Sequence, residues 1–228
     1  MTPVERIEQA RARIARRYET WLSELNDLRE RHLNGLGYTG EDRVFAALQE
    51  TIDFTRLELT EIANAAFDEV VVMGSQASTP VEMPALQSMR EQMNQAIDAG
   101  MSRDVSNLRQ GMGADSIRFK RISPRYGASV SKAIIRGAVF GLALYRQIDA
   151  AGRRMKSTPF IATAVRGAIY DAYLHAFLCG ALHLQSLTCT ARHPEREDVS
   201  ISIPDFDTWA EEFVHPNALW EFSLGVSA

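Results

Sequence analysis

Apolar residues near the start of the chain recur every seven positions, as they do along one face of a long helix. One row consists of Ile7, Ile14, Trp21 and Leu28, and a second of Tyr18, Leu25 and His32. Thr2, Pro3 and Glu5 form a capping-box pattern that is typical of a helix start. The sequence therefore predicts a helix from there to Gly35 and Gly37. We interpret its stripe as packing on the protein's own core, with docking to a protein partner as the alternative.

Glycine and proline divide the following segment into shorter pieces. A second helix is expected from a cap at Thr39 to about Val72, where Gly74 ends it. Helices over 85–99 and 102–110 are expected to end at Gly100, Gly111 and Gly113. Because 75–84 is rich in loop-forming residues, the predicted divisions are a helical region at 1–74, a linker at 75–84 and a helical core at 85–228, unless all form one domain.

The middle of the chain predicts a short strand and then two long helices. Residues 117–122 alternate imperfectly, as a strand does, and Ser123-Pro124 begins a pattern that continues to Lys156. Thr158-Pro159 begins another that continues to about Thr190. Since the connection is short, we expect these helices to form an antiparallel pair. Its contact would bury Ile134, Gly137, Gly141 and Leu144, with the two glycines in GxxxG spacing.

The last segment predicts one strand and two small helices. Val199, Ile201 and Ile203 alternate strictly, and helices are expected after Asp207 and after Asn217. The predicted fold class is therefore mostly α: a multi-helix bundle with a central antiparallel helical pair and one short β ribbon.

Composition excludes several protein classes. The 228 residues are 46% hydrophobic and 24% charged, which is typical of a globular domain rather than a disordered or collagen-like chain. Two cysteines, Cys179 and Cys189, do not suggest a disulfide framework or a zinc cluster. The first residues lack the apolar core of a secretory signal, and no apolar stretch is long enough for a transmembrane helix. We expect a cytoplasmic location.

Charge is strongly segregated along the chain, although the formal net charge is only −4. Residues 1–98 carry 10 basic and 17 acidic groups, and residues 171–228 carry 2 and 9. Residues 99–170 carry 13 basic and 3 acidic groups, a net charge of +10. Arginine outnumbers lysine by 22 to 3, which suits bidentate phosphate contacts. A uniformly basic, histone-like protein is excluded, but a local basic surface is expected.

The basic segment predicts a track for a nucleic-acid backbone. On one helix, Arg125, Lys132, Arg136 and Arg154 would lie within about 40° of one another over about 44 Å. Nearby aromatic residues, Phe119 and Tyr126, would suit base stacking. The candidate binding residues are Arg118, Lys120, Arg121, Arg125, Lys132, Arg136 and Arg154. The resulting hypothesis is a non-enzymatic binding subunit of a larger assembly that contacts phosphates without reading sequence.

Four alternatives to this track remain at the sequence level. The acidic flanks could neutralise the basic segment within the chain, or the segment could bind an acidic protein or an anionic membrane surface. An enzyme would instead place a polar or metal site on the 159–190 helix, where Asp171, His175 and Cys179 share a face. No nucleotide-binding or hydrolase motif supports that reading. We therefore expect no catalytic residue, metal or cofactor.

Overall fold

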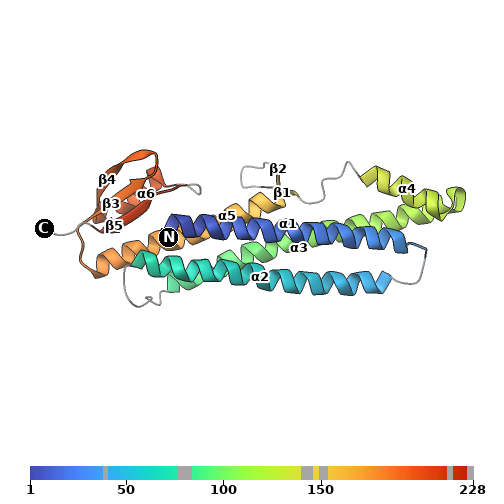
Figure 1. The fold of residues 1–228 in the computed structure, drawn as a ribbon, viewed down its shortest axis with the longest axis horizontal. Coiled ribbons are helices and arrows are strands. Elements are labelled where there is room, and N and C mark those ends of the chain that lie inside the picture. The colour runs from blue at the N-terminus through green and yellow to red at the C-terminus, as the bar shows by residue number, and fades with distance from the viewer. Residues whose placement is uncertain (38–40, 76–83, 140–145, 149–153, 215–217, 225–228) are drawn as a thin grey trace. The chain divides into compact units, whose positions relative to one another are not determined.

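The computed structural model describes residues 1–37, 41–75, 84–139, 146–148, 154–214 and 218–224. The fold is mostly α, as the sequence predicts, with several helices and small antiparallel sheets (Figure 1). The helices are α1 (Pro3–Gly35), α2 (Glu41–Ser75), α3 (Pro84–Tyr126), α4 (Ala128–Val139), α5 (Ser157–His183) and α6 (Phe206–Phe213). In the sheets, β1 (Arg146–Ile148) pairs with β2 (Arg154–Lys156), and β3 (Thr188–His193) lies between β4 (Arg196–Ser202) and β5 (Glu221–Leu224).

The chain divides into two compact units, each assembled from stretches that are far apart in the sequence. Unit 1 contains residues 1–14, 60–96 and 162–228, and unit 2 contains residues 15–59 and 97–161. Helices α1, α2, α3 and α5 each contribute a segment to both units. The predicted division at 75–84 stays a prediction, since 76–83 lie outside the described residues.

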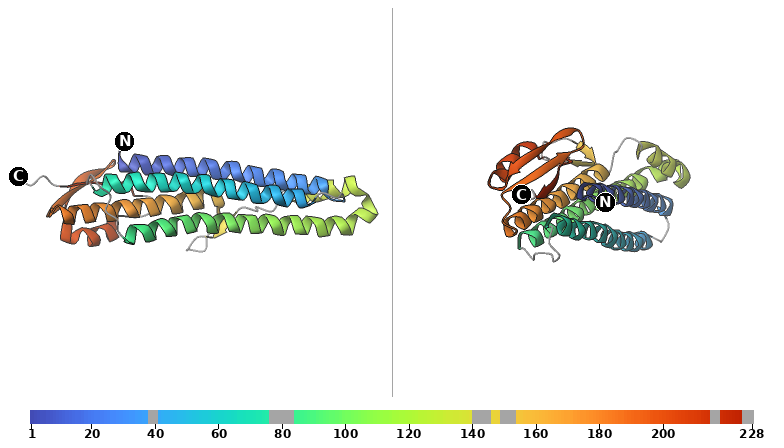
Figure 2. Two further views of the ribbon diagram at one scale, coloured as in Figure 1. Left: turned by 90° about the horizontal axis from the view of Figure 1, so that it is seen from below. Right: turned by 60° about the vertical axis from the view of Figure 1, so that its left-hand side comes forward.

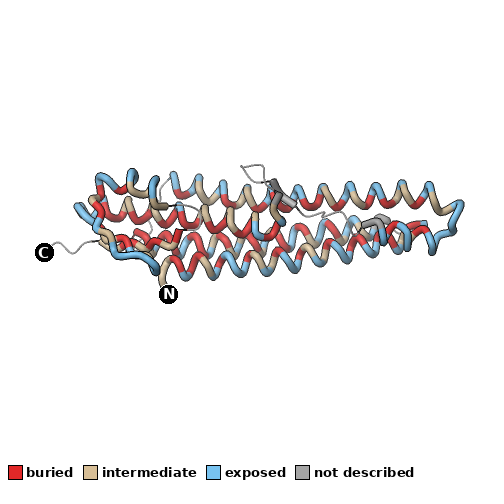
Figure 3. Tube along the Cα trace, turned by 90° about the horizontal axis from the view of Figure 1, so that it is seen from above, coloured by how far each residue is buried: buried red, intermediate tan, exposed pale blue. Residues whose placement is uncertain are grey.

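The predicted first helix is confirmed, including its start. The Thr2 amide donates to the Glu5 carboxylate at 2.8 Å, and the Glu5 amide donates to the Thr2 hydroxyl at 3.2 Å. Both predicted rows of α1 are buried, with exposed positions between them on each turn (Figure 3). The chain's own helices therefore cover the stripe that we considered as a docking surface.

Polar contacts fix how the helices of unit 2 pack. The Tyr18 hydroxyl donates to Asp104 at 2.8 Å, and Arg29 pairs with Asp115 at 2.9 Å. Residue numbers on α1 and α3 rise together in these contacts, so the two helices run parallel. Arg17 of α1 binds Glu58 and Thr55 of α2. In contrast to α3, α2 runs antiparallel to α1 (Figure 2).

The predicted breaks between 85 and 126 are wrong, because α3 is one continuous helix. It passes through Gly100, Gly111 and Gly113, and the predicted strand at 117–122 is helical. Close packing favours a glycine at one of these positions, since a Cβ on Gly100 would overlap Ile161. The buried residues of α3 recur at spacings of three and four, as on one face of a helix. Burial of this face outweighs the intrinsic cost of glycine in a helix. Within unit 2 the buried residues include Ile97, Met101, Asp104, Leu108, Met112, Asp115 and Phe119.

The predicted helix at 124–156 is also wrong. Helix α3 ends at Tyr126, Gly127 adopts a left-handed φ of +76°, and α4 then covers only 128–139. Strands β1 and β2 occupy part of the remainder, so no single helix pairs with α5. Ile134 is 38% exposed and Gly137 faces open space, contrary to the predicted contact. Gly141 and Leu144 lie outside the described residues.

An aromatic core in unit 1 joins α5 to the C-terminal sheet. The Tyr170 hydroxyl donates to the Trp220 carbonyl, and the Phe222 amide donates to the Tyr173 hydroxyl, each at 2.8 Å. Phe177 and Phe222 pack with ring centroids 5.4 Å apart. Because β5 pairs with β3 here, the small helix expected after Asn217 is wrong.

The other predictions for this region are confirmed in part. The strand expected around Val199 and Ile201 is β4, although Ile203 begins a short 3-10 turn, and the helix expected after Asp207 is α6. The helix expected to reach Thr190 ends at His183. Among the described residues, no helix is both long and apolar enough to cross a membrane.

Candidate nucleic-acid interface

Four of the predicted binding residues lie on the last turns of α3, and we call them the basic tip: Arg118, Lys120, Arg121 and Arg125. Arg118 is half-buried and the other three are exposed. At 100° per residue, Arg118, Arg121 and Arg125 lie within about 60° of one another. In the part of the chain that the structure describes, no carboxylate pairs with any of the four. Three of these four charged side chains, those of Lys120, Arg121 and Arg125, therefore extend into solvent.

The turn after α3 separates the basic tip from two other predicted residues. The Gly127 amide donates to the Ser123 carbonyl at 2.9 Å, and the Ser131 hydroxyl donates to the Gly127 carbonyl at 2.7 Å. These bonds end α3 and begin α4, which folds back beside the end of α1 (Figures 1 and 2).

Lys132 and Arg136 bind the protein itself. Lys132 Nζ donates to the Asn34 carbonyl at 2.6 Å, while Arg136 pairs with Glu30 at 2.9 Å and donates to the Asn34 side chain at 2.9 Å. Intramolecular neutralisation, one of the alternatives from the sequence, thus describes Arg136. The predicted single helical track from Arg125 to Arg154 does not form, and the Arg154 side chain lies outside what the structure describes.

A small apolar cluster packs on the buried side of α3 next to the basic tip. It joins α1, α3 and α4 through Leu33, Leu36, Phe119 and Ile135, with Ile122 against it. Lys132 also lies over the Phe119 ring, 5.8 Å from its centroid. Burial of this cluster holds the three helix ends together and so fixes the position of the cations on α3.

A buried polar network holds the same part of α3 against α1. Arg29 binds Asp115 through Nε at 3.0 Å and a terminal nitrogen at 2.9 Å, with each side chain only 8% exposed. His32 Nε2 lies 3.1 Å from the Met112 carbonyl oxygen and 3.0 Å from the Ser116 hydroxyl. The Arg29–Asp115 bonds satisfy two charges that burial would otherwise penalise.

Exposed apolar side chains are interleaved with the cations. Ile117 is 72% exposed, Tyr126 46% and Val130 51%. The Arg125 guanidinium lies 5.2 Å from the centroid of the Tyr126 ring. The surface thus combines exposed cations with exposed apolar side chains.

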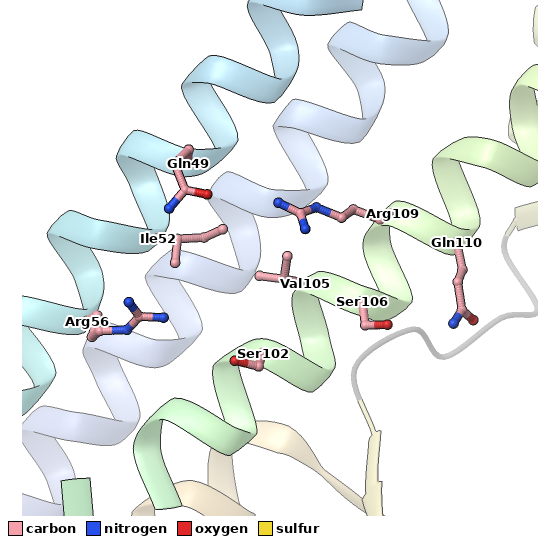
Figure 4. A pocket seen from close by; sticks show the side chains of 8 residues that line it. All are labelled: Gln49, Ile52, Arg56, Ser102, Val105, Ser106, Arg109 and Gln110. Carbon is pink, nitrogen blue, oxygen red and sulfur yellow. The ribbon is translucent and has the colours of Figure 1, made fainter. Parts of the chain in front are cut away.

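The sequence did not indicate a groove that lies between α2 and α3 in unit 2. Its volume is about 300 Å³, and its residues are Gln49, Ile52, Arg56, Ser102, Val105, Ser106, Arg109 and Gln110 (Figure 4). Arg56 is held by Asp98 at 2.7 Å, whereas exposed Arg109 extends from α3 toward α2. Because a helix end was predicted at Gly111, the sequence did not indicate that Arg109 and the basic tip lie on one helix.

The residues considered for an enzyme site occupy α5 in unit 1. Asp171 is exposed, and the Cys179 sulfur lies 3.8 Å from His175 Nε2. Within the described ranges, no group of three His, Cys, Asp or Glu side chains is placed to hold a metal ion.

The two cysteines are expected to differ in reactivity. Cys189 is fully buried, and burial raises the pKa of its thiol to about 11. Burial also raises the pKa of Cys179, which is partly exposed. Because the thiolate is the reacting form, we expect native protein at mildly alkaline pH to label slowly at Cys179 and far more slowly at Cys189. Mass spectrometry after thiol labelling measures both rates, with denatured protein as control. Equal native rates would contradict the prediction.

A scan against protein-family models, a search of curated proteins and a search of solved structures found no match to this chain.

Proposed function

We propose that this chain is a non-enzymatic helical subunit that binds the phosphate backbone of nucleic acid through the basic tip. The observation that carries the proposal is local charge. Residues 116–137 contain six basic residues and no acidic one, and the four on α3 lack a carboxylate partner among the described residues. Arginine binds phosphate oxygens with two parallel hydrogen bonds, and clustered cations release counterions when they bind a nucleic acid.

The form of the surface supports binding without sequence readout. The cations lie at the end of a helix whose backbone is held in place by the Arg29–Asp115 pair and the Phe119 cluster. The acidic remainder of the chain opposes loose association with a polyanion. A larger assembly that orients the nucleic acid is consistent with this balance, and a cytoplasmic location is part of the proposal.

The proposal is tested by measuring the salt dependence of binding. We expect the double variant Arg121→Gln/Arg125→Gln to bind DNA and RNA more weakly and to lower the slope of log K against log salt by about 2. Fluorescence anisotropy at several salt concentrations gives the slope. Arg16→Gln, an exposed arginine on α1, is the matched control and should match wild type.

Arg136→Gln provides a second comparison. Since Arg136 binds Glu30 and Asn34, its loss should lower the melting temperature. Its effect on the salt slope should be smaller than that of the double variant. The proposal fails if wild type binds no nucleic acid above an acidic control protein, or if the double variant keeps the wild-type slope.

A further inference from the structure

The exposed face of α3 joins the groove to Lys120 of the basic tip, whereas Arg118, Arg121 and Arg125 lie about 120–180° around the helix from Arg109. Arg109 and Lys120 are 11 residues apart, so they lie within about 20° of each other and about 16 Å apart along the helix. Gly113 and Ile117 are exposed between them on the same face. A chain of phosphates bound at Lys120 can therefore follow α3 to Arg109 without crossing another helix of unit 2.

The groove has the chemistry of a small polar binding site. Buried Ile52 and Val105 provide apolar surface, and Ser102 and Ser106 provide exposed hydroxyl groups. Arg109 places a guanidinium over this surface from the α3 side (Figure 4). A volume of about 300 Å³ is at the lower end of the range of about 300–1,000 Å³ for ligand pockets.

We infer that the nucleic acid bound by this protein is single-stranded, and that one of its nucleotides occupies the groove between α2 and α3. The inference rests on the proposed function. In a duplex the bases are stacked inside, so only phosphates and groove edges reach a protein surface, whereas an unpaired base can leave the strand and enter a pocket. Exposed Ile117 and Tyr126 beside the cations offer further apolar contact that an unpaired strand can use.

The experiment compares a labelled oligothymidine, a labelled single-stranded RNA and a blunt duplex on wild-type protein and groove variants. We expect wild type to bind the single strands about tenfold more tightly than the duplex. Ser106→Trp, which fills the groove from an exposed helical position, should remove about tenfold of single-strand affinity and leave duplex affinity unchanged. Arg109→Gln should likewise lower the affinity for the single strands more than the affinity for the duplex.

Matched variants and a vesicle probe separate the possible failures. Ser23→Trp, at an exposed serine on α1 outside the groove, should bind like wild type, and melting curves should show that each variant is folded. Equal affinity for single strands and duplex, or unchanged binding by Ser106→Trp, overturns the inference and leaves the proposed function standing. Binding to phosphatidylserine vesicles with no binding to any nucleic acid overturns both.

Discussion

Replacing Asp115 by alanine is expected to lower the free energy of unfolding by about 3–5 kcal/mol. Asp115 and Arg29 are each 8% exposed in their side chains and bind each other through two guanidinium nitrogens. Removing the carboxylate leaves a guanidinium in the interior without its counter-charge. Arg29 cannot lose its proton in response, because arginine stays charged in proteins, so the cost falls on the folded state.

Urea denaturation of Asp115→Ala and Arg29→Ala measures this cost. The double variant Arg29→Met/Asp115→Leu is the control, because it removes both charges and fills the space with apolar atoms. We expect it to be much closer to wild type in stability than either single alanine variant. If each single variant loses less than about 1 kcal/mol, the pair is hydrated in solution and the prediction is wrong.

Gly180→Ala is expected to destabilise unit 1 by about 1–3 kcal/mol. A Cβ at Gly180 would overlap the Ser75 carbonyl oxygen and lie 2.9 Å from its carbon. The neighbouring contact is also close, because a Cβ on Gly74 would lie 2.8 Å from the Tyr173 carbonyl oxygen. Backbone atoms rather than flexible side chains occupy this space, so the helix ends of α2 and α5 would have to separate.

Gly167 offers a matched control on the same helix. A Cβ there meets nothing within 4 Å, so Gly167→Ala should stabilise the protein by about 0.5–1 kcal/mol through helix propensity. Thermal unfolding of the two variants should therefore shift in opposite directions. A rise in melting temperature for Gly180→Ala would show that α2 and α5 do not approach closely at this point.

The prediction of α1 is correct and that of α3 is wrong for one physical reason. The rows of α1 are almost wholly apolar, and its capping residues are adjacent in sequence. In α3 the buried face contains Asp104 and Asp115, whose partners on α1 are 86 residues away. A local pattern cannot show such partners, so these carboxylates and the glycines resembled interruptions. Strand β5 was missed for the same reason, because its pairing with β3 is distant in sequence.

The basic surface was predictable in composition and only partly in geometry. The absence of acidic residues between Asp115 and Asp149 is visible in the sequence, and the four cations of the basic tip have no carboxylate partner among the described residues. The positive φ of Gly127 reverses the chain and directs Arg136 to Glu30. A helical projection through residue 127 assumes that no such turn exists, and so it joined two separate surfaces.

The two buried polar contacts between α1 and α3 also select one sliding position of these helices. Tyr18–Asp104 and Arg29–Asp115 have the same separation of 86 residues, so one alignment satisfies both. Moving α3 by one heptad would place Arg29 opposite Leu108 or Ile122 and leave its charge buried without a partner. An apolar replacement such as Arg29→Met/Asp115→Leu removes that penalty and leaves the buried Tyr18–Asp104 contact to select the alignment.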